Sequence, residues 1–407
     1  MHRALVIGGS LGGLFAANLL LRTGWDVLVL ERAVEPLTGR GAGLVVQPPL
    51  LEGLRRVGAV VDATIGVPVA GRVTFARDGT EVAAIALPQV CTSWGRLHSL
   101  LSLAFPEVRV RRGAGLVGLE QDADGVTVRL ADGSCLVAEL LVGADGLRST
   151  VRRLLLPDIE LVYAGYVAWR GLAEEAELSR TTHATLFHRL AWCLPDGEQM
   201  LGYPVPGPAN EIVPGRRRYN FVWYRPVPDK TVPAMQTDTA GRLHVDGISP
   251  QRIRPELVAA MRRDGETLLS PQFVEVIHLA RAPFFQPIYD LVSPAIAFGR
   301  VALLGDAAFV ARPHVGMGAI KAAEDAMILA DMLAVAPVKE ALAAYNARRC
   351  PAGAAIVAES RRLGAYLSAQ LGSLGRPSVV PLRDPVTVMR ENGVWRGPWQ
   401  EAGSAGH

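Results

Sequence analysis

Cysteines are few in this sequence and stand far apart. None of the four takes part in a Cys-X-X-Cys pair: they are Cys91, Cys135, Cys193 and Cys350. This spacing argues against a zinc site and against a scaffold held by disulfides. We therefore expect a reduced, cytoplasmic protein without a metal ion.

An excess of charge of either sign is also lacking. The 407 residues include 42 Lys and Arg against 39 Asp and Glu, a net charge of +3. Nucleic-acid-binding proteins neutralise many phosphates with clustered basic residues, so this balance argues against a nucleic-acid partner. Half of the residues are hydrophobic, which excludes a disordered chain and, at this length, predicts two or three folded domains.

An unbroken hydrophobic segment long enough for a membrane is missing as well. Residues Ala4–Leu21 carry no charge, but Gly8, Gly9, Gly12 and Gly13 all fall near the start of this run. So many glycines would weaken a membrane-spanning helix or a signal sequence. We expect no membrane span, and the glycines need another explanation.

The glycines lie in a strand–turn–helix–strand pattern. Ala4–Ile7 is an apolar run typical of a buried parallel strand, and the glycine turn 8–13 follows it. Apolar residues at helical spacing continue to Gly24, and Asp26–Leu30 reads as a second strand. This is the βαβ unit that binds a dinucleotide, although the segment alone does not separate FAD from NAD.

Each conspicuous residue of the unit has a physical task. Gly8 permits the tight turn, Gly13 lets the helix approach the strand, and the free N–H groups of the helix face a pyrophosphate. Ser10 stands where the fingerprint has its second glycine, and its hydroxyl can donate to phosphate. Glu31 follows the second strand and is expected to accept from a ribose hydroxyl. The candidate residues here are Gly8, Ser10, Gly12, Gly13, Glu31 and Arg32.

Three further segments carry polar groups at the ends of predicted elements. Arg96 lies at a helix start, and Asp145 stands where a buried strand that begins at Leu140 runs into an Asp-Gly turn. A third strand ends at Gly305-Asp306, and Gly316 and Gly318 then open a helix. Taken singly, Arg96 is a solvated arginine and Asp306 a capping aspartate. Together, Asp145 and Asp306 each follow a predicted strand, and the carboxyl ends of strands are where α/β folds bind their ligands.

The motifs resemble, in order and spacing, those of the single-component (class A) FAD-dependent aromatic hydroxylases, over about residues 3–370. The resemblance implies an α/β fold, with a discontinuous Rossmann-type FAD-binding domain, a mainly antiparallel β-sheet substrate domain and a C-terminal helix. The implied FAD-binding segments are 1–72, 96–162 and 283–372, and the substrate segments are 73–95 and 163–282. Helical spacing over 338–372 is broken at Pro351, and the tail 373–407 is expected to be loosely ordered.

The resemblance also assigns roles to residues. Arg96 reaches the flavin phosphate or ribityl region, and Asp306 binds the ribityl chain. The turn at Asp145 is implicated in the binding of both FAD and NAD(P)H. The helix that opens at Gly316 and Gly318 faces the flavin pyrimidine. Gln47 is a further cofactor-binding candidate, from a stretch that matches the family.

The implied chemistry is hydroxylation of a small aromatic or heteroaromatic substrate, resembling a hydroxypyridine or a phenol. Noncovalent FAD, NADH or NADPH and O2 take part, through a flavin C4a-hydroperoxide. Deprotonating a ring hydroxyl assists this chemistry, so a base is needed. The candidates, in declining order, are His314, Tyr224, Tyr203 and His188, and Pro313 is expected beside the reacting position.

Other interpretations stay open at this stage. A flavin oxidoreductase of the same fold that reduces double bonds, or a halogenase, would share the motifs. A non-catalytic nucleotide-binding scaffold is disfavoured by the combination of Arg96, Asp145 and Asp306. The sequence does not give the substrate, and the resemblance favours NADH over NADPH. A homodimer remains one open oligomeric state.

Overall fold

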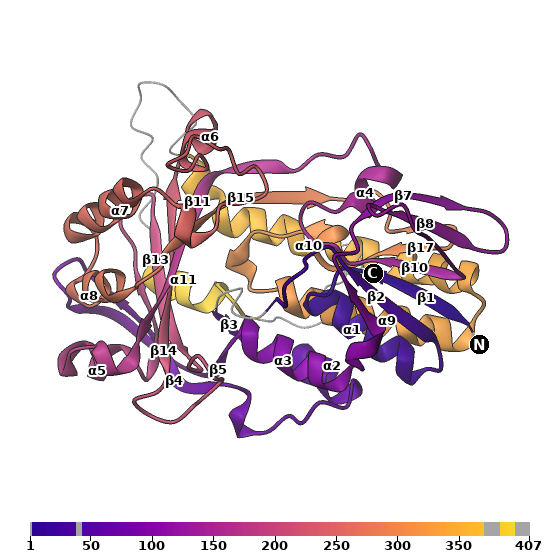
Figure 1. Ribbon diagram of the computed structural model, residues 1–407. Helices are drawn as coiled ribbons and strands as arrows, with labels where there is room; N and C mark the ends of the chain where they lie inside the picture. The colour runs from indigo at the N-terminus through magenta and orange to yellow at the C-terminus, as the bar shows by residue number, and fades with distance from the viewer. Residues whose placement is uncertain (1, 38–42, 370–382, 395–407) are drawn as a thin grey trace, which may run out of the picture.

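The protein is described by a computed structural model over residues 2–37, 43–369 and 383–394. Two large sheets face one another across the molecule (Figure 1). The first is six-stranded, in the order β16-β17-β10-β1-β2-β6, and only β16 runs antiparallel to its neighbour. Its strands are β1 (Arg3–Ile7), β2 (Asp26–Glu31), β6 (Val110–Arg112), β10 (Leu140–Gly143), β16 (Ala297–Phe298) and β17 (Val301–Leu303).

Helices bury the apolar strands of this sheet. The glycine turn leads from β1 directly into α1, which packs against α9 and α3. The helices of this part are α1 (Leu11–Arg22), α2 (Pro48–Arg56), α3 (Trp94–Ala104), α4 (Thr150–Leu155) and α9 (Gly318–Val335). Register pairs Ile7 with Gly143 and Gly143 with Leu303, so three strands end at one edge. The expected dinucleotide segments therefore meet in space.

The second sheet has nine strands in the order β18-β15-β11-β14-β13-β12-β4-β5-β3. Every pairing is antiparallel except β12 with β4, as the sequence predicts for a mainly antiparallel sheet. Its strands are β3 (Gly43–Val45), β4 (Val67–Phe75), β5 (Glu81–Ser93), β11 (Val162–Glu174), β12 (Arg189–Cys193), β13 (Gln199–Val205), β14 (Arg218–Pro226), β15 (Phe284–Val292) and β18 (Phe309–Val310).

The two faces of the nine-stranded sheet have different neighbours. Successive side chains of a strand point to opposite faces, so Val167 and Trp169 of β11 join an apolar cluster with residues of α8. Tyr166 and Ala168 belong to another cluster on the opposite face. Helices α5, α7 and α8 cover the outer face, at the left of Figure 1. Their bounds are α5 (Arg180–Leu186), α7 (Pro255–Leu268) and α8 (Pro271–Leu279), and α6 (Val232–Met235) lies near the top.

Short elements connect these layers. A small antiparallel sheet consists of β7 (Leu116–Gln121), β8 (Val126–Leu130) and β9 (Cys135–Ala138). The short 3-10 helices are η1 (Ala63–Ile65), η2 (Glu107–Arg109), η3 (Glu175–Glu177), η4 (Asp229–Thr231), η5 (Pro250–Arg252), η6 (Gly305–Ala307) and η7 (Pro313–Val315). Within the described residues, no helix is both long and apolar enough to cross a membrane.

Sheet pairing divides the chain differently from the expected domain limits. β3 and the start of β4 pair in the nine-stranded sheet, although segment 1–72 was expected in the FAD-binding domain. β15 also pairs there, with β11, although it falls inside 283–372. The reason is that a strand joins whichever edge its backbone can pair with, which local sequence does not reveal. The domain limits themselves stay a prediction.

In the C-terminal part, the expected helix break at Pro351 is wrong, and the expected loose order of the tail is wrong for its described part. Helix α10 (Val338–Ala369) continues through Pro351, because buried residues on both sides, including Tyr345 and Ile356, hold it against the rest of the protein. Part of the tail is ordered, since α11 (Pro385–Glu391) buries Val388 and Met389 against β4 and β5. The rest of segment 373–407 lies outside the described residues.

Candidate active site

A cavity of about 440 Å³ lies between the two sheets. One wall comes from the turns at the edge of the six-stranded sheet and from the start of α9. The opposite wall comes from β11, β13 and β14. The predicted site residues that line it are Ser10, Gly12, Tyr203, Tyr224, Asp306, Pro313, His314, Gly316 and Gly318.

The glycine turn after β1 needs its glycines for steric reasons. Gly8 has φ +105°, and a Cβ there would stand 2.5 Å from the backbone oxygen of Ala144. A Cβ at Gly13 would stand 1.9 Å from the backbone oxygen of Gly8. No larger residue fits at either position without moving the backbone, so the turn holds α1 close to the strand ends.

Two helix N-termini open onto the cavity. Ser10 precedes α1 and makes no side-chain capping bond, and Met317 precedes α9 with no capping bond either. Gly316, at φ +69°, turns the chain into α9. Uncapped N–H groups and the positive end of the helix dipole favour anions. A pyrophosphate at α1 and a negatively charged ring at α9 fit these two ends.

Glu31 is oriented by the backbone around it. One carboxylate oxygen accepts from Gly9 N at 2.7 Å and the other from Ala33 N at 2.8 Å. Each oxygen keeps a free lone pair, so the carboxylate can still accept from ribose hydroxyls. A small recess lined by Glu31 and His98 lies beside it. These features fit the adenosine end of FAD.

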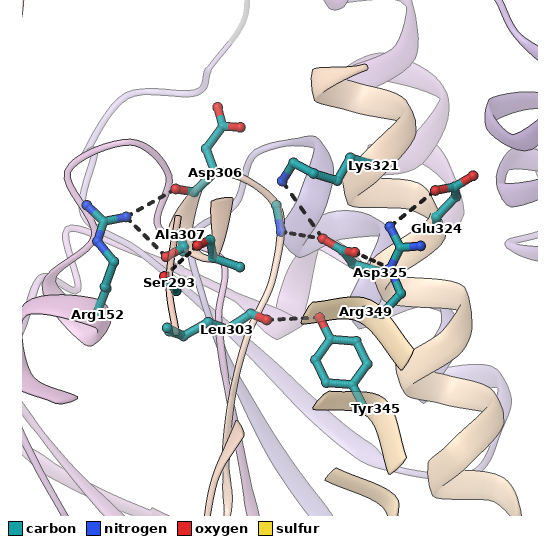
Figure 2. A network of polar contacts seen from close by, with 12 residues as sticks. Arg152, Ser293, Leu303, Asp306, Ala307, Lys321, Glu324, Asp325, Tyr345 and Arg349 are labelled. Carbon is teal, nitrogen blue, oxygen red and sulfur yellow. Dashed lines mark hydrogen bonds and ion pairs between the residues drawn. The ribbon is translucent and has the colours of Figure 1, made fainter. Parts of the chain in front are cut away.

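Asp306 lies in η6, and its backbone is held by a buried polar network (Figure 2). Arg152 donates to the backbone oxygens of Asp306 and Ala307, both at 3.1 Å. Asp325 of α9 accepts from Gly305 N at 3.0 Å. Figure 2 shows the Asp306 carboxylate pointing away from this network, and it lines the cavity instead.

Charges beneath the turn are balanced within the protein. Asp325 lies between Lys321, whose Nζ is 3.9 Å away, and Arg349, whose Nε is 2.7 Å away (Figure 2). Lys321 is 0% exposed, and burial lowers the pKa of its amine. The carboxyl of Asp306 is open to the cavity, where partial loss of solvent raises its pKa while Lys321 and Arg152 act in the opposite direction. The turn therefore holds the Asp306 carboxylate at the cavity, while the charged side chains beneath it are paired with one another.

Four further predicted cofactor residues have side chains that line neither the cavity nor the recess at Glu31. Asp145 accepts from Thr150 N at 2.6 Å and so caps α4. Arg96 donates to the hydroxyl of Thr64 at 2.6 Å, and Gln47 donates to the backbone oxygen of Gly393 at 2.9 Å. The fourth, Arg32, is exposed after β2. Their roles toward FAD or NAD(P)H stay predictions.

The wall formed by the nine-stranded sheet is aromatic and carries one cation. Trp192, Tyr203 and Tyr224 line it, together with Arg170 of β11. Burial raises the pKa of Tyr203, and it raises that of Tyr224 to about 12. Both phenols therefore remain protonated at neutral pH, which makes them poor bases.

His314 lies in η7, and its ring contacts residues of β11 and β14 in the nine-stranded sheet. Its Nε2 is 2.9 Å from the hydroxyl of Tyr166, and its ring centroid is 4.3 Å from that of Tyr224. The residue is 3% exposed. Burial, and the nearby Arg383, Arg312 and Arg170, lower the pKa of His314 to about 3. The imidazole is therefore neutral at physiological pH.

Sequence reasoning missed part of this wall and misplaced one candidate. His188 is exposed and does not line the cavity. Arg170 and Tyr166 were given no role from the sequence, although both lie on β11 two positions from Ala168 and share its face. A cation on an otherwise apolar strand was the available signal.

Comparisons with known proteins identify similar chains and folds. A family described as FAD binding domain-like matches residues 163–290. The chain is 35% identical over 332 residues to 2,6-dihydroxypyridine 3-monooxygenase of Paenarthrobacter nicotinovorans, which covers 81% of this chain and 82% of that protein. It is 29% identical over 377 residues to the FAD-dependent urate hydroxylase of Klebsiella pneumoniae, covering 88% and 89%. The structure of 2,6-dihydroxypyridine-3-hydroxylase from Arthrobacter nicotinovorans superposes with a TM-score of 0.84 at 31% identity, covering 94% and 98%.

Proposed function

The chain belongs to the FAD-dependent aromatic monooxygenases, and we propose that it hydroxylates an electron-rich heteroaromatic ring that binds as its oxyanion. The family membership makes it an enzyme that uses FAD, NAD(P)H and O2 on an aromatic substrate. The identity of the ring and the roles of individual residues are our proposal. The relative that is 35% identical to this chain is named for its action on 2,6-dihydroxypyridine, and rings of that kind are the substrates we infer.

The observation that carries the proposal is the position of Arg170. Its side chain lines the cavity, and within the described residues no ion pair joins it to a carboxylate. A guanidinium in a partly buried cavity strongly favours an anion beside it. The aromatic residues Trp192, Tyr203 and Tyr224 of the same wall give flat, apolar surfaces for a ring. This combination fits a small aromatic oxyanion.

The residues of the opposite wall would hold the cofactor. The turn 8–13 would bind the pyrophosphate, Glu31 the adenosine ribose, and Asp306 the ribityl chain. When bound and reduced by NADH or NADPH, the flavin supplies the activated oxygen that enters the substrate ring. The chain's own part is to place the ring near the flavin, keep water out and stabilise the ring's negative charge.

Ionisation of the ring links binding to reactivity. A deprotonated hydroxyl pushes electron density into the ring, which makes its carbon a better target for an electrophilic oxygen. Arg170 favours that ionised form by its charge alone. No side chain in the cavity needs to act as a base, because the substrate can lose its proton to water before it binds.

Two finer features are also part of the proposal. We infer NADH as the electron donor, which a comparison of kcat/KM for NADH and NADPH under identical conditions tests. A homodimer is the inferred oligomeric state, and sedimentation at several protein concentrations tests it.

A panel of ring compounds tests the substrate class. The holoenzyme is mixed with 2,6-dihydroxypyridine, uric acid, 4-hydroxybenzoate or unsubstituted pyridine, and NADH oxidation, product and peroxide are measured. We expect acceleration with product only for ionisable rings. Equal product formation from pyridine, which has no acidic proton and forms no anion, would overturn the proposal.

A substitution tests the role of Arg170. Arg170→Met removes one charge-assisted hydrogen bond, worth about 1.5–3 kcal/mol, so Kd for the ring anion should rise about 10- to 150-fold. FAD content should stay unchanged. Arg189→Met is the matched control, because Arg189 pairs with exposed Glu81 away from the cavity. An unchanged Kd for Arg170→Met would contradict the assignment.

A further inference from the structure

One nitrogen of His314 is bound within the protein and the other is not. Nε2 is 2.9 Å from the Tyr166 hydroxyl, whereas Nδ1 is buried and has no hydrogen-bond partner among the described residues. The Cδ2–Nε2 edge faces α10, since a Cβ added to Gly364 would lie 3.0–3.2 Å from these two atoms. The Nδ1 edge therefore faces away from α10, and His314 lines the cavity.

The neighbours of Tyr166 determine which way its hydrogen bond to His314 runs. The guanidinium of Arg312 lies over the ring of Tyr166, with its Cζ 5.8 Å from the ring centroid, and its charge makes the hydroxyl a better proton donor. Among the described residues, Nε2 of His314 is the hydrogen-bond partner of that hydroxyl, so the proton of Tyr166 goes to Nε2. Arg312 is in turn held by Asp290, whose carboxylate accepts its Nε at 2.8 Å. Asp290 is 0% exposed.

We propose that Asp290, Arg312 and Tyr166 fix His314 in the tautomer with its proton on Nδ1, and that this N–H donates to an oxygen of the substrate. The inference rests on the proposed function for the identity of the substrate, but not for the tautomer. Asp290, Arg312 and Tyr166 are positioning residues, and His314 is the group that touches the substrate.

A neutral imidazole carries one N–H, so a proton on Nδ1 leaves Nε2 as the acceptor that Tyr166 needs. The ring stays neutral because it is buried and because the charged groups that act on it, Arg383, Arg312 and Arg170, are all cations. Its other ionisable neighbours, Tyr166 and Tyr224, are protonated phenols whose pKa values are raised by burial.

The tautomer has a chemical consequence. Because Nδ1 already holds a proton, His314 does not remove one from the substrate there, contrary to the base role expected from sequence. It instead selects an acceptor, which is a deprotonated ring hydroxyl or a ring carbonyl. Together with Arg170, it defines a site for the oxyanion of the ring.

Nitrogen-15 NMR of histidine-labelled holoenzyme tests the tautomer without substrate. The signals of His314 are identified by their loss in His314→Gln. We expect a protonated Nδ1 and an unprotonated Nε2 across about pH 5 to 8, the range in which an unperturbed histidine titrates. A proton on Nε2, or on both nitrogens, in the wild type would overturn the proposal whatever the variants do.

Removing the Tyr166 hydroxyl tests how the tautomer is fixed. Tyr166→Phe removes the donor to Nε2, so the fraction with a proton on Nδ1 should fall. Tyr163→Phe is the matched control on the same strand, because its hydroxyl donates to the backbone oxygen of Val227 at 3.0 Å. The control should leave the tautomer unchanged. An unchanged tautomer in Tyr166→Phe would show that the relay does not fix it.

Binding of 2,6-dihydroxypyridine tests the donation to substrate. His314→Ala should raise Kd about 10-fold or more, the effect of losing a hydrogen bond to a charged group. His314→Gln keeps an N–H donor and should recover part of this loss. Equal Kd values for wild type and both variants would contradict the donation. If the wild type binds no ring oxyanion of the panel, the proposed substrate class fails, while the spectrum still decides the tautomer.

Discussion

His314 is a histidine that the fold keeps neutral. Its pKa is lowered to about 3, mainly by burial, while the unfolded chain has the ordinary value near 6.5. As pH falls below about 6.5, the unfolded state gains a proton that the folded state does not accept. This difference favours unfolding, so the contribution of His314 is present above that pH and is lost as pH falls toward 3.

The expected size of this effect is measurable. Linkage predicts that His314 alone lowers the free energy of unfolding by about 1 kcal/mol between about pH 6.5 and 5.5. Urea unfolding at a series of pH values should therefore show a shallower acid slope for His314→Gln than for the wild type. Parallel slopes would mean that His314 protonates normally in the folded protein.

Asp306 provides a second test at a single residue. The carboxylate projects into the cavity and, in our account, accepts from the ribityl hydroxyls of FAD. Asp306→Asn removes the charge from that bond and should weaken FAD binding about 10- to 150-fold. Titration of apoprotein with FAD measures the change. Asp331→Asn, which alters an exposed ion pair on α9, should leave the affinity unchanged.

Sequence predicted the backbone requirements of the site better than the orientation of its polar side chains. Gly8 and Gly13 were predictable because a turn of this shape tolerates no Cβ. Asp145 and Arg96 were recognised by pattern, yet their side chains bond to Thr150 N and Thr64. Which way a polar side chain turns depends on partners from distant segments. Arg170 escaped notice for the same reason, because its lack of a carboxylate partner is visible only in three dimensions.

At the scale of elements, α11 shows how one buried cation organises a segment. Arg72 of β4 is 0% exposed and donates to the backbone oxygens of Met389, Asn392 and Gly393 at the end of α11. Burial lowers the pKa of its guanidinium to about 10, so it stays charged at neutral pH. A cation at a helix C-terminus is favourable. Gly393 in turn borders the cavity.

Loss of this cation should loosen α11. In Arg72→Met, the carbonyls at the helix end lose a charged donor, worth about 1.5–3 kcal/mol, so amide exchange in 385–393 should accelerate about 10- to 150-fold. Hydrogen exchange with mass spectrometry measures this. Arg55→Met, at an exposed pair with Glu52, is the control. Unchanged exchange in Arg72→Met would show that apolar packing alone holds α11.

The elements near the C-terminus were predicted less well than the N-terminal βαβ unit. The βαβ unit is local, so its strands, turn and helix follow from periodicity over about 30 residues. Helix α10 crosses Pro351 because distant elements pack along it. Sequence did contain a signal for α11, since Asp384 before Pro385 is a capping pattern and its carboxylate accepts from Thr387 N.

At the scale of the whole molecule, the cofactor is expected to join segments far apart in the chain. The turn 8–13, η6 and the start of α9 meet around one cavity, and Glu31 lines a small recess near the same turn. No residue in this set is a cysteine, and we predict that FAD is held without a covalent bond. Acid precipitation should leave the flavin in the supernatant, and flavin retained by the precipitate would contradict this.

Linkage gives the same cofactor an effect on stability. A ligand that binds only the folded state raises the free energy of unfolding by about 2.7 kcal/mol at 100 times its Kd. The apoprotein should therefore melt at a lower temperature than the protein with excess FAD. Because the FAD segments and the nine-stranded sheet share the cavity, both should gain protection from amide exchange. Protection confined to the glycine turn would contradict a shared site.

The central claim is that the cavity binds the oxyanion of an aromatic ring beside FAD, and that one oxygen atom from O2 is added to this ring. The most direct test is turnover of 2,6-dihydroxypyridine with NADH under oxygen-18 gas, followed by mass spectrometry of the product. The account predicts a hydroxylated product that carries one oxygen-18 atom, with little peroxide for each NADH consumed. A product without the label, or NADH oxidation that yields only peroxide with every ring in the panel, would contradict it.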